Sequence, residues 1–227
     1  MSKTLLESTT YIESAHPAIM SFAQSATQNS DTTREKAIRL YYAVRDGIRY
    51  NPYCTSLTES HYRASYVLEQ HQGFCVQKAI LLAAVARAVG VPCRLGFAIV
   101  RNHLATQKLI DIMQTDLFVF HGYTVFLIDG AWVKATPAFD LALCEKFGVR
   151  PLEFDGREDS LFHPYDLSGK RHMEYVHDYG QFDDFPFETM CAEFKRYYPR
   201  MYAELAKLDD SPPAKDTDFR DEKPIKT

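Results

Sequence analysis

Paired cysteines are missing from this sequence. Its five cysteines, an odd number, stand singly at Cys54, Cys75, Cys93, Cys144 and Cys191, and no two are spaced as CxxC. This pattern argues against a disulfide framework and against zinc-ribbon or thioredoxin-type motifs, so we expect free cytosolic thiols. The N-terminus lacks a basic segment followed by an apolar one, and no apolar run reaches the roughly 18 residues that a membrane span needs. We therefore expect a cytoplasmic protein that neither enters nor binds a membrane.

An excess of positive charge is also missing. The 227 residues include 26 Lys and Arg against 30 Asp and Glu, which gives a net charge of −4. Because nucleic-acid-binding domains are usually basic, we expect no nucleic-acid partner. Hydrophobic residues make up 46% of the chain and charged residues 25%, which is ordinary for a globular protein. The length favours one domain with additional segments.

Helices are expected mainly in the first half of the chain. The clearest runs over 76–89, where apolar residues surround almost the whole circumference and Gly90 and Pro92 end the helix. An earlier helix is expected to end at Gly47, with Asp31 or Thr32 as its N-cap. Short helical patterns also cover 64–70 and 187–208.

Strand patterns follow the buried helix. They cover 93–100, 118–128 and 131–135, and the Asp129-Gly130 pair between the last two predicts a tight hairpin. Helices followed by an antiparallel sheet favour an α+β fold over a doubly wound α/β fold. We expect a single domain over residues 1–208, with a core at about 35–140 and a C-terminal extension at 141–208. Residues 150–185 carry loop signals, and the charged tail 209–227 is expected to be extended or disordered.

Cys75 stands at the N-terminus of the predicted buried helix. The positive potential there favours a thiolate, and the unpaired N–H groups of the first turn can stabilise an oxyanion. One of the tyrosines that precede it could add a hydroxyl donor, although the sequence does not single one out: Tyr50, Tyr53, Tyr62 and Tyr66. The alternative is that Cys75 is a small buried hydrophobic residue.

His121 begins the strand that enters the hairpin. If residues 128 and 131 pair, paired numbers sum to 259 and His121 faces position 138. Its diagonal neighbours on the same face are Thr136 and Asp140, roughly 7–8 Å away between Cα atoms. A carboxylate there can hold the imidazole in one tautomer and stabilise its cation. The register beyond Pro137 is open, because proline cannot donate to the ladder.

Three blocks in order resemble the transglutaminase-like superfamily. They are the Gly73-Phe74-Cys75 entry with its alanine- and leucine-rich helix, the Gly90-Val91-Pro92-Cys93-Arg94 block, and the His121–Leu127 and Gly130–Val133 strands. Segments 101–104 and 135–139 are similar to blocks of a bacterial subgroup. The resemblance implies a papain-like fold in which Cys75 is the nucleophile and His121 is the base. The family pattern has its acid at the position of Thr136, and we expect Asp140 to replace it. The alternative is that Asp140 caps a following turn and that Thr136 or a backbone carbonyl orients the ring of His121.

The resemblance implies a cysteine enzyme that hydrolyses or transfers an amide through a thioester, with a Cys75-His121-Asp140 triad and no cofactor. Its expected partner is a peptide or a small amide substrate, and the sequence does not define the oligomeric state. The departure at Thr136 supports an alternative, a catalytically inactive domain that binds peptides or a protein. Six polar side chains in the loop-rich segment could hold a metal but lack regular ligand spacing, so we expect a solvated loop: His163, Asp166, His172, Glu174, His177 and Asp178.

Overall fold

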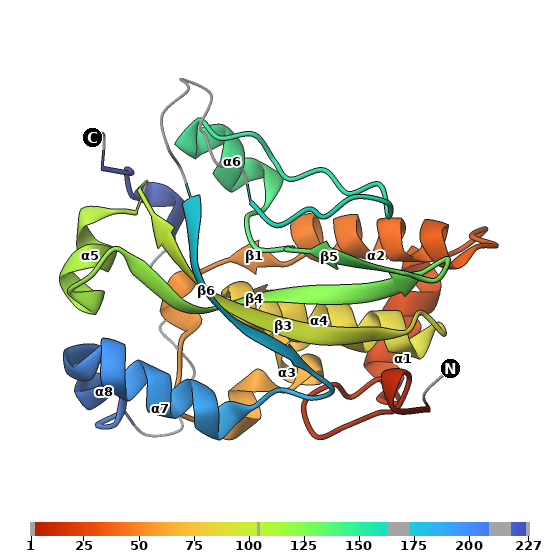
Figure 1. The fold of residues 1–227 in the computed structure, drawn as a ribbon, viewed down its shortest axis with the longest axis horizontal. Helices are drawn as coiled ribbons and strands as arrows, with labels where there is room; N and C mark the ends of the chain where they lie inside the picture. The colour runs from red at the N-terminus through yellow and green to blue at the C-terminus, as the bar shows by residue number, and fades with distance from the viewer. Residues whose placement is uncertain (1–2, 104, 163–172, 209–218, 226–227) are drawn as a thin grey trace.

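A four-stranded antiparallel sheet, backed by a central helix, organises the chain (Figure 1). The computed structural model describes residues 3–103, 105–162, 173–208 and 219–225. The elements are η1 (Lys3–Leu5), α1 (Pro17–Ala26), α2 (Thr33–Gly47), β1 (Arg49–Tyr50), η2 (Pro52–Cys54), η3 (Glu59–Tyr62), α3 (Ala64–Gln70), β2 (Gln72–Gly73), α4 (Cys75–Ala88), β3 (Cys93–Asn102), α5 (Gln107–Met113), β4 (Leu117–Ile128), β5 (Ala131–Ala135), α6 (Leu141–Phe147), β6 (Met173–Phe182), α7 (Phe187–Tyr197), α8 (Pro199–Leu205) and η4 (Phe219–Asp221).

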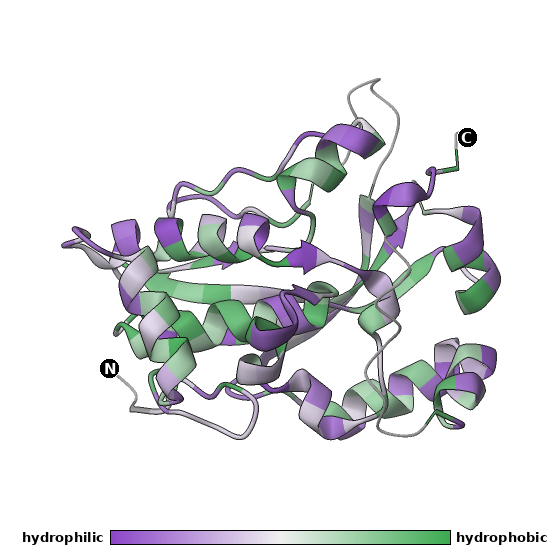
Figure 2. Ribbon diagram, turned by 180° about the vertical axis from the view of Figure 1, so that it is seen from behind, coloured by the Kyte–Doolittle hydropathy of each residue, from purple (hydrophilic) through white to green (hydrophobic). Residues whose placement is uncertain are grey.

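The central helix α4 packs against β3 and β4, and α1, α2 and α3 pack around it. All of its residues except the last are buried, as expected for a helix that is apolar on every side. Seen from behind, hydrophobic residues gather on this helix and on the sheet (Figure 2). The α+β prediction and the buried helix are both confirmed, and the sheet order is β5-β4-β3-β6.

Local signals also placed the helix ends and the hairpin correctly. Thr32 caps α2 in a capping box with Glu35. Ile128 pairs with Ala131 around the Asp129-Gly130 turn, so the predicted register is confirmed as far as Ala135. Both turn residues have positive φ, 50° at Asp129 and 83° at Gly130, as a tight hairpin turn requires.

Several elements escaped the sequence patterns. Helices α1, α5 and α6 were not predicted, and β6 lies inside the segment 150–185 that was expected to be loops. Most side chains of β6 are exposed or half-buried, because it is an edge strand paired only with β3, and it therefore carries little apolar periodicity. The helix expected over 187–208 is divided at Tyr198 by Pro199, which begins α8.

The C-terminal segment 219–225 packs on the domain, although the whole tail was expected to be extended or disordered. Phe219 is 3% exposed and contacts the rings of Tyr50 and Tyr53. Ile225 donates its N–H to the carbonyl of Ala105. One apolar side chain therefore anchors a segment whose composition is otherwise typical of disorder. No helix in the described ranges is long and apolar enough to cross a membrane.

Candidate active site

Cys75 is the first residue of α4, and its side chain is 5% exposed. The turn before it is fixed because Gly73 pairs with Tyr50 between β2 and β1, and Gln77 Oε1 accepts the N–H of Phe74 at 3.2 Å. Burial raises the pKa of the thiol to about 11, although hydrogen bonds from backbone N–H groups, first that of Gly122, act to lower it. Desolvation outweighs the helix N-terminus, so the resting thiolate expected from the sequence gives way to a neutral thiol.

Strand β4 crosses the first turn of α4 at Gly122. A Cβ atom built on Gly122 would lie 2.8 Å from Val76 Cα and 3.2 Å from the carbonyl oxygen of Cys75. Only glycine permits an approach this close between the two backbones. Gly122 is the residue after His121. The strand that carries His121 is therefore in direct contact, at Gly122, with the first turn of the helix that carries Cys75.

His121 is 4% exposed, and neither ring nitrogen has a hydrogen-bond partner among the described residues. No hydrogen bond therefore joins it to the Cys75 thiol in this structure. Burial lowers the pKa of the imidazole to about 4, so the ring is neutral at pH 7. The ring lines a cavity of about 30 Å³ together with Thr136, whose Oγ1 is likewise buried without a partner.

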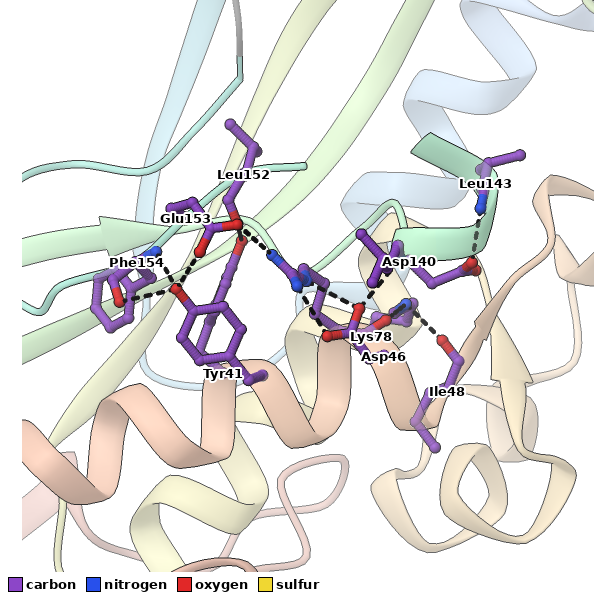
Figure 3. Close-up of polar contacts among 12 residues, drawn as sticks. Tyr41, Asp46, Ile48, Lys78, Asp140, Leu143, Leu152, Glu153 and Phe154 are labelled. Carbon is purple, nitrogen blue, oxygen red and sulfur yellow. Dashed lines mark hydrogen bonds and ion pairs between the residues drawn. The ribbon is translucent and has the colours of Figure 1, made fainter. Parts of the chain in front are cut away.

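Asp140 uses both carboxylate oxygens on backbone groups. Oδ1 accepts the N–H of Leu143 at 3.0 Å and so caps α6 (Figure 3). Oδ2 accepts the N–H of Tyr50 at 2.9 Å. No hydrogen bond connects this carboxylate to His121. The assignment of Asp140 as the residue that orients His121 therefore stays a prediction. What the contacts show is a structural link between α6 and β1.

Beside Asp140 lies a fully buried amine that the sequence analysis did not single out. Lys78, one turn after Cys75 on α4, donates to the carbonyls of Arg45 and Ile48 at 2.9 and 2.5 Å (Figure 3). Burial lowers its pKa to about 7, against the favourable charges of Asp140 and Asp46. A lysine in a helix made mostly of apolar residues was the signal in the sequence that could have identified it. Its ammonium group binds the C-terminal end of α2, where carbonyl groups lack partners.

Two tyrosines share a second cavity, of about 40 Å³, with Cys75. Tyr50 comes from β1, and burial followed by the proximity of Cys75 raises the pKa of its phenol well above the ordinary value. Tyr198 comes from the junction of α7 and α8. Its hydroxyl is already engaged, because it donates to the carbonyl of Leu117 at 2.7 Å and accepts the N–H of Val119 at 2.6 Å.

A larger groove of about 690 Å³ adjoins this cavity between η2, α5 and α8. The residues that line both spaces are Pro52, Thr55, Leu109 and Met201. Apolar side chains form most of its walls, and charged ones stand at its rim, among them Lys108 and Arg200. Because α8 belongs to the extension, the neighbourhood of Cys75 could not be derived from the core motifs alone.

The polar residues of the loop-rich segment divide into two groups. His163, Asp166 and His172 lie outside the described residues. In the described part of the chain no cluster of side chains could hold a metal ion. There Asp178, on β6, accepts a hydrogen bond from Tyr123 Oη at 3.2 Å.

Comparison with known proteins agrees with the order of the motifs. Residues 20–137, about half of the chain, match the transglutaminase-like superfamily. Among curated proteins, no relative matches the chain. A proposed cysteine protease from Cytophaga hutchinsonii is 15% identical, with a TM-score of 0.45 over 78% of this chain and 53% of that one. A proposed protease from Parabacteroides distasonis is 18% identical, with a TM-score of 0.37 over 52% of this chain and 22% of that one.

Red sea bream transglutaminase is 14% identical, with a TM-score of 0.36 over 85% of this chain and 41% of that one. The chain thus spans about half or less of the length of these solved structures. The match to the family over residues 20–137 includes both Cys75 and His121, and it contains the helix and hairpin that carry them. The chain belongs to the transglutaminase-like superfamily.

Proposed function

We propose that this protein is a cysteine-dependent enzyme that hydrolyses or transfers amides through a thioester on Cys75. The observation that carries the proposal is the contact at Gly122, which holds the strand of His121 against the helix turn of Cys75. A nucleophile and its base must lie on elements that meet in this way, and the hydrogen bond between them is often loose without substrate. Because the thiol and the imidazole are both neutral, His121 acts as a general base when substrate binds.

In the first half of the reaction, His121 takes the thiol proton while the sulfur of Cys75 attacks the amide carbon. The carbonyl oxygen becomes an oxyanion. When the C–N bond breaks, His121 returns the proton to the leaving amine, and a thioester remains. In the second half, His121 takes a proton from water or from an acceptor amine, which attacks the thioester. The C–S bond breaks, the proton returns to the sulfur, and an acid or a new amide leaves.

Tyr50 is the side chain we assign to the oxyanion. Its phenol shares the cavity with Cys75 and has no hydrogen-bond partner in the described part of the chain, whereas the Tyr198 hydroxyl is occupied on both sides. A phenol is protonated at neutral pH and can donate a hydrogen bond, and the raised pKa of Tyr50 extends this to more alkaline solution. Backbone N–H groups at the start of α4 are the remaining donors, as at other helix N-termini.

The groove beside the Cys75 cavity is the path we assign to the acyl donor. Its apolar walls and charged rim suit a peptide or a small amide with an apolar side chain next to the scissile bond. This assignment rests on the four residues that line both spaces. Whether water or an amine completes the reaction is an outcome of the experiment below.

The alternative, an inactive domain that binds peptides or a protein, also has an observation in its favour. The Cys75 thiol is neutral, 5% exposed and not hydrogen-bonded to His121. An inactive domain has no need of a reactive thiol. Formation of a thioester on Cys75 therefore separates the two functions.

The experiment uses the full chain and two probes, p-nitrophenyl acetate and a library of peptide amides, with mass spectrometry of the cysteine-containing peptides. We expect acylation at Cys75 that is lost in Cys75→Ala and kept in Cys191→Ala, where the one half-buried thiol is removed. Water against an added primary amine as the second reactant distinguishes hydrolysis from transfer. Absence of a Cys75 adduct with both probes would exclude the enzyme and leave the binding domain.

A further inference from the structure

Strand β4 contains a bulge immediately before His121. His121 pairs with Ala98 on β3, and Phe118 pairs with Val100, so three steps along β4 match two steps along β3. Residues 119–120 therefore lie opposite a single residue of the partner strand, which is the arrangement of a β-bulge. Bulges bend a strand and change the direction of the side chains beside them.

The bulge decides on which face of the sheet His121 lies. Successive side chains of a regular strand alternate between faces, so residues 118 and 121 would lie on opposite ones. Because Ala98 and Val100 are two residues apart on β3, their partners His121 and Phe118 share a face instead. Phe118 is part of the wall of the Cys75 cavity. The extra residue thus places the candidate base on the same face as this wall.

The backbone of the bulge adopts a conformation that its sequence does not favour. Phe120 has a φ of 62°, in the left-handed region, which glycine adopts readily and a bulky residue rarely does. Its ring is fully buried, with its centroid 4.6 Å from that of Phe97 and 4.9 Å from that of Tyr179. Such conformations persist only where surrounding contacts enforce them. The contacts that hold the bulge therefore also place His121.

One of these contacts is made by the hydroxyl of Tyr198. It donates to the carbonyl of Leu117 at 2.7 Å and accepts the N–H of Val119 at 2.6 Å, so it joins two backbone groups where the bulge begins. Strand β5 pairs with residues 124–128 of β4 and ends before this stretch. Tyr198 is 3% exposed, so water competes little for these hydrogen bonds. The hydroxyl thus binds a part of β4 that lies beyond the end of β5.

We propose that Tyr198 is a positioning residue for His121: its hydroxyl holds the bulge of β4 and thereby keeps the imidazole in place for the reaction. This role rests on the proposed function of His121 as the base. Tyr198 joins α7 to α8, outside the residues 20–137 that match the family. The C-terminal extension thereby does more than enclose Cys75, because it also fixes the strand that carries the base.

The test uses Tyr198→Phe in the full chain, which removes the hydroxyl and keeps the ring. We expect the amide of Val119 to exchange with deuterium faster, and the NMR signal of the His121 imidazole, assigned by its loss in His121→Gln, to move. The control is Tyr42→Phe. Tyr42 Oη likewise accepts a backbone N–H, that of Phe154 at 3.1 Å, on a segment that is not part of β4. This variant should leave the exchange and the signal unchanged.

Acylation of Cys75 by p-nitrophenyl acetate should fall about 10–100-fold at pH 7 in Tyr198→Phe, since a displacement of about 1 Å can cost 10²-fold in rate. The loss should shrink as the pH approaches 10. The pKa of the thiol is about 11, so hydroxide then forms more of the thiolate without help from His121. A change in packing alone would lower the rate by the same factor at every pH. Tyr42→Phe should keep the wild-type pH profile.

Four results would overturn the inference: rapid exchange of the Val119 amide in wild type, which needs no variant, an unmoved His121 signal in Tyr198→Phe, an equal response in Tyr42→Phe, or a loss of acylation that is the same at every pH. Exchange and NMR require no activity, so the two proposals can fail separately. If wild-type Cys75 forms no thioester but the His121 signal responds to Tyr198→Phe alone, the role of Tyr198 stands and the proposed function falls.

Discussion

Gly122→Ala is expected to separate the strand of His121 from the helix of Cys75. The added Cβ would lie 2.8 Å from Val76 Cα, a backbone atom that no side-chain rotation can move. Overpacking of this kind costs about 1–3 kcal/mol. For a chain of this size each kcal/mol lowers the Tm by about 2–4 °C, so we expect a decrease of about 2–12 °C. Because a displacement of about 1 Å can cost 10²-fold in rate, acylation of Cys75 should fall as well.

Gly47→Ala is the matched control. It lies at the end of α2, and nothing stands within 4 Å of the Cβ that would be added. In this variant thermal unfolding by circular dichroism should give a Tm no lower than that of wild type, because alanine favours a helix over glycine. Acylation at equal folded concentration should match wild type. If Gly122→Ala unfolds at the wild-type Tm and acylates at the wild-type rate, the contact between β4 and α4 is not the constraint on which the proposed function depends.

Three further substitutions test neighbouring residues. Tyr50→Phe should slow acylation of Cys75 by about 10²–10³-fold, which is the effect of losing one oxyanion donor. It should leave alkylation of Cys75 by iodoacetamide unchanged, since alkylation forms no oxyanion. Tyr42→Phe is the control, and a Tyr50→Phe variant that loses acylation and alkylation equally would point to altered packing. Asp140→Asn should lower turnover by up to about 10⁴-fold if the carboxylate orients His121 during catalysis; a less stable variant with the wild-type rate per folded molecule would instead confine Asp140 to holding Tyr50 and α6. Lys78→Met removes an amine whose pKa is about 7 in the fold and 10.5 ordinarily. Between these values the unfolded chain binds more protons, so the stability of wild type relative to the variant should rise from about pH 7 to pH 10 in urea unfolding, and a flat difference would contradict the burial of this charge.

The parts of the fold that could be predicted are those whose conformation depends on residues close by in the sequence. The cap at Thr32, the end of α4 before Gly90 and the Asp129-Gly130 turn each depend on a few neighbouring residues. The register that follows from the turn then placed Thr136 on the face of His121, and the two side chains do line one cavity. Strand β6 was not predictable in this way, because its pairing with β3 is made across a long separation in sequence and leaves little apolar pattern.

The sequence could indicate which residues are candidates for the site, but not which atoms these residues contact in the fold. Motif order made Cys75 and His121 the candidates, and this assignment stays a prediction. The ionisation of a thiol depends on burial by distant segments, and Tyr198 lines the cavity of Cys75 from more than a hundred residues away. Asp140 was placed near His121 on register alone. The ladder between β4 and β5 ends at Ala135, before Pro137, and the N–H of Thr136 bonds to the carbonyl of Ser160. The carboxylate of Asp140 accepts the N–H groups of Tyr50 and Leu143.

The enclosure of Cys75 has a consequence for biosynthesis. One wall of its cavity is Tyr50, another includes Tyr198 and Met201, and the ring of Phe219 rests 5.8 Å from that of Tyr50. During translation the helix of Cys75 leaves the ribosome long before these later residues, and domains complete their packing only when all their segments are available. A nascent chain stalled before Tyr198 will therefore react with alkylating reagents at this thiol faster than the finished chain does.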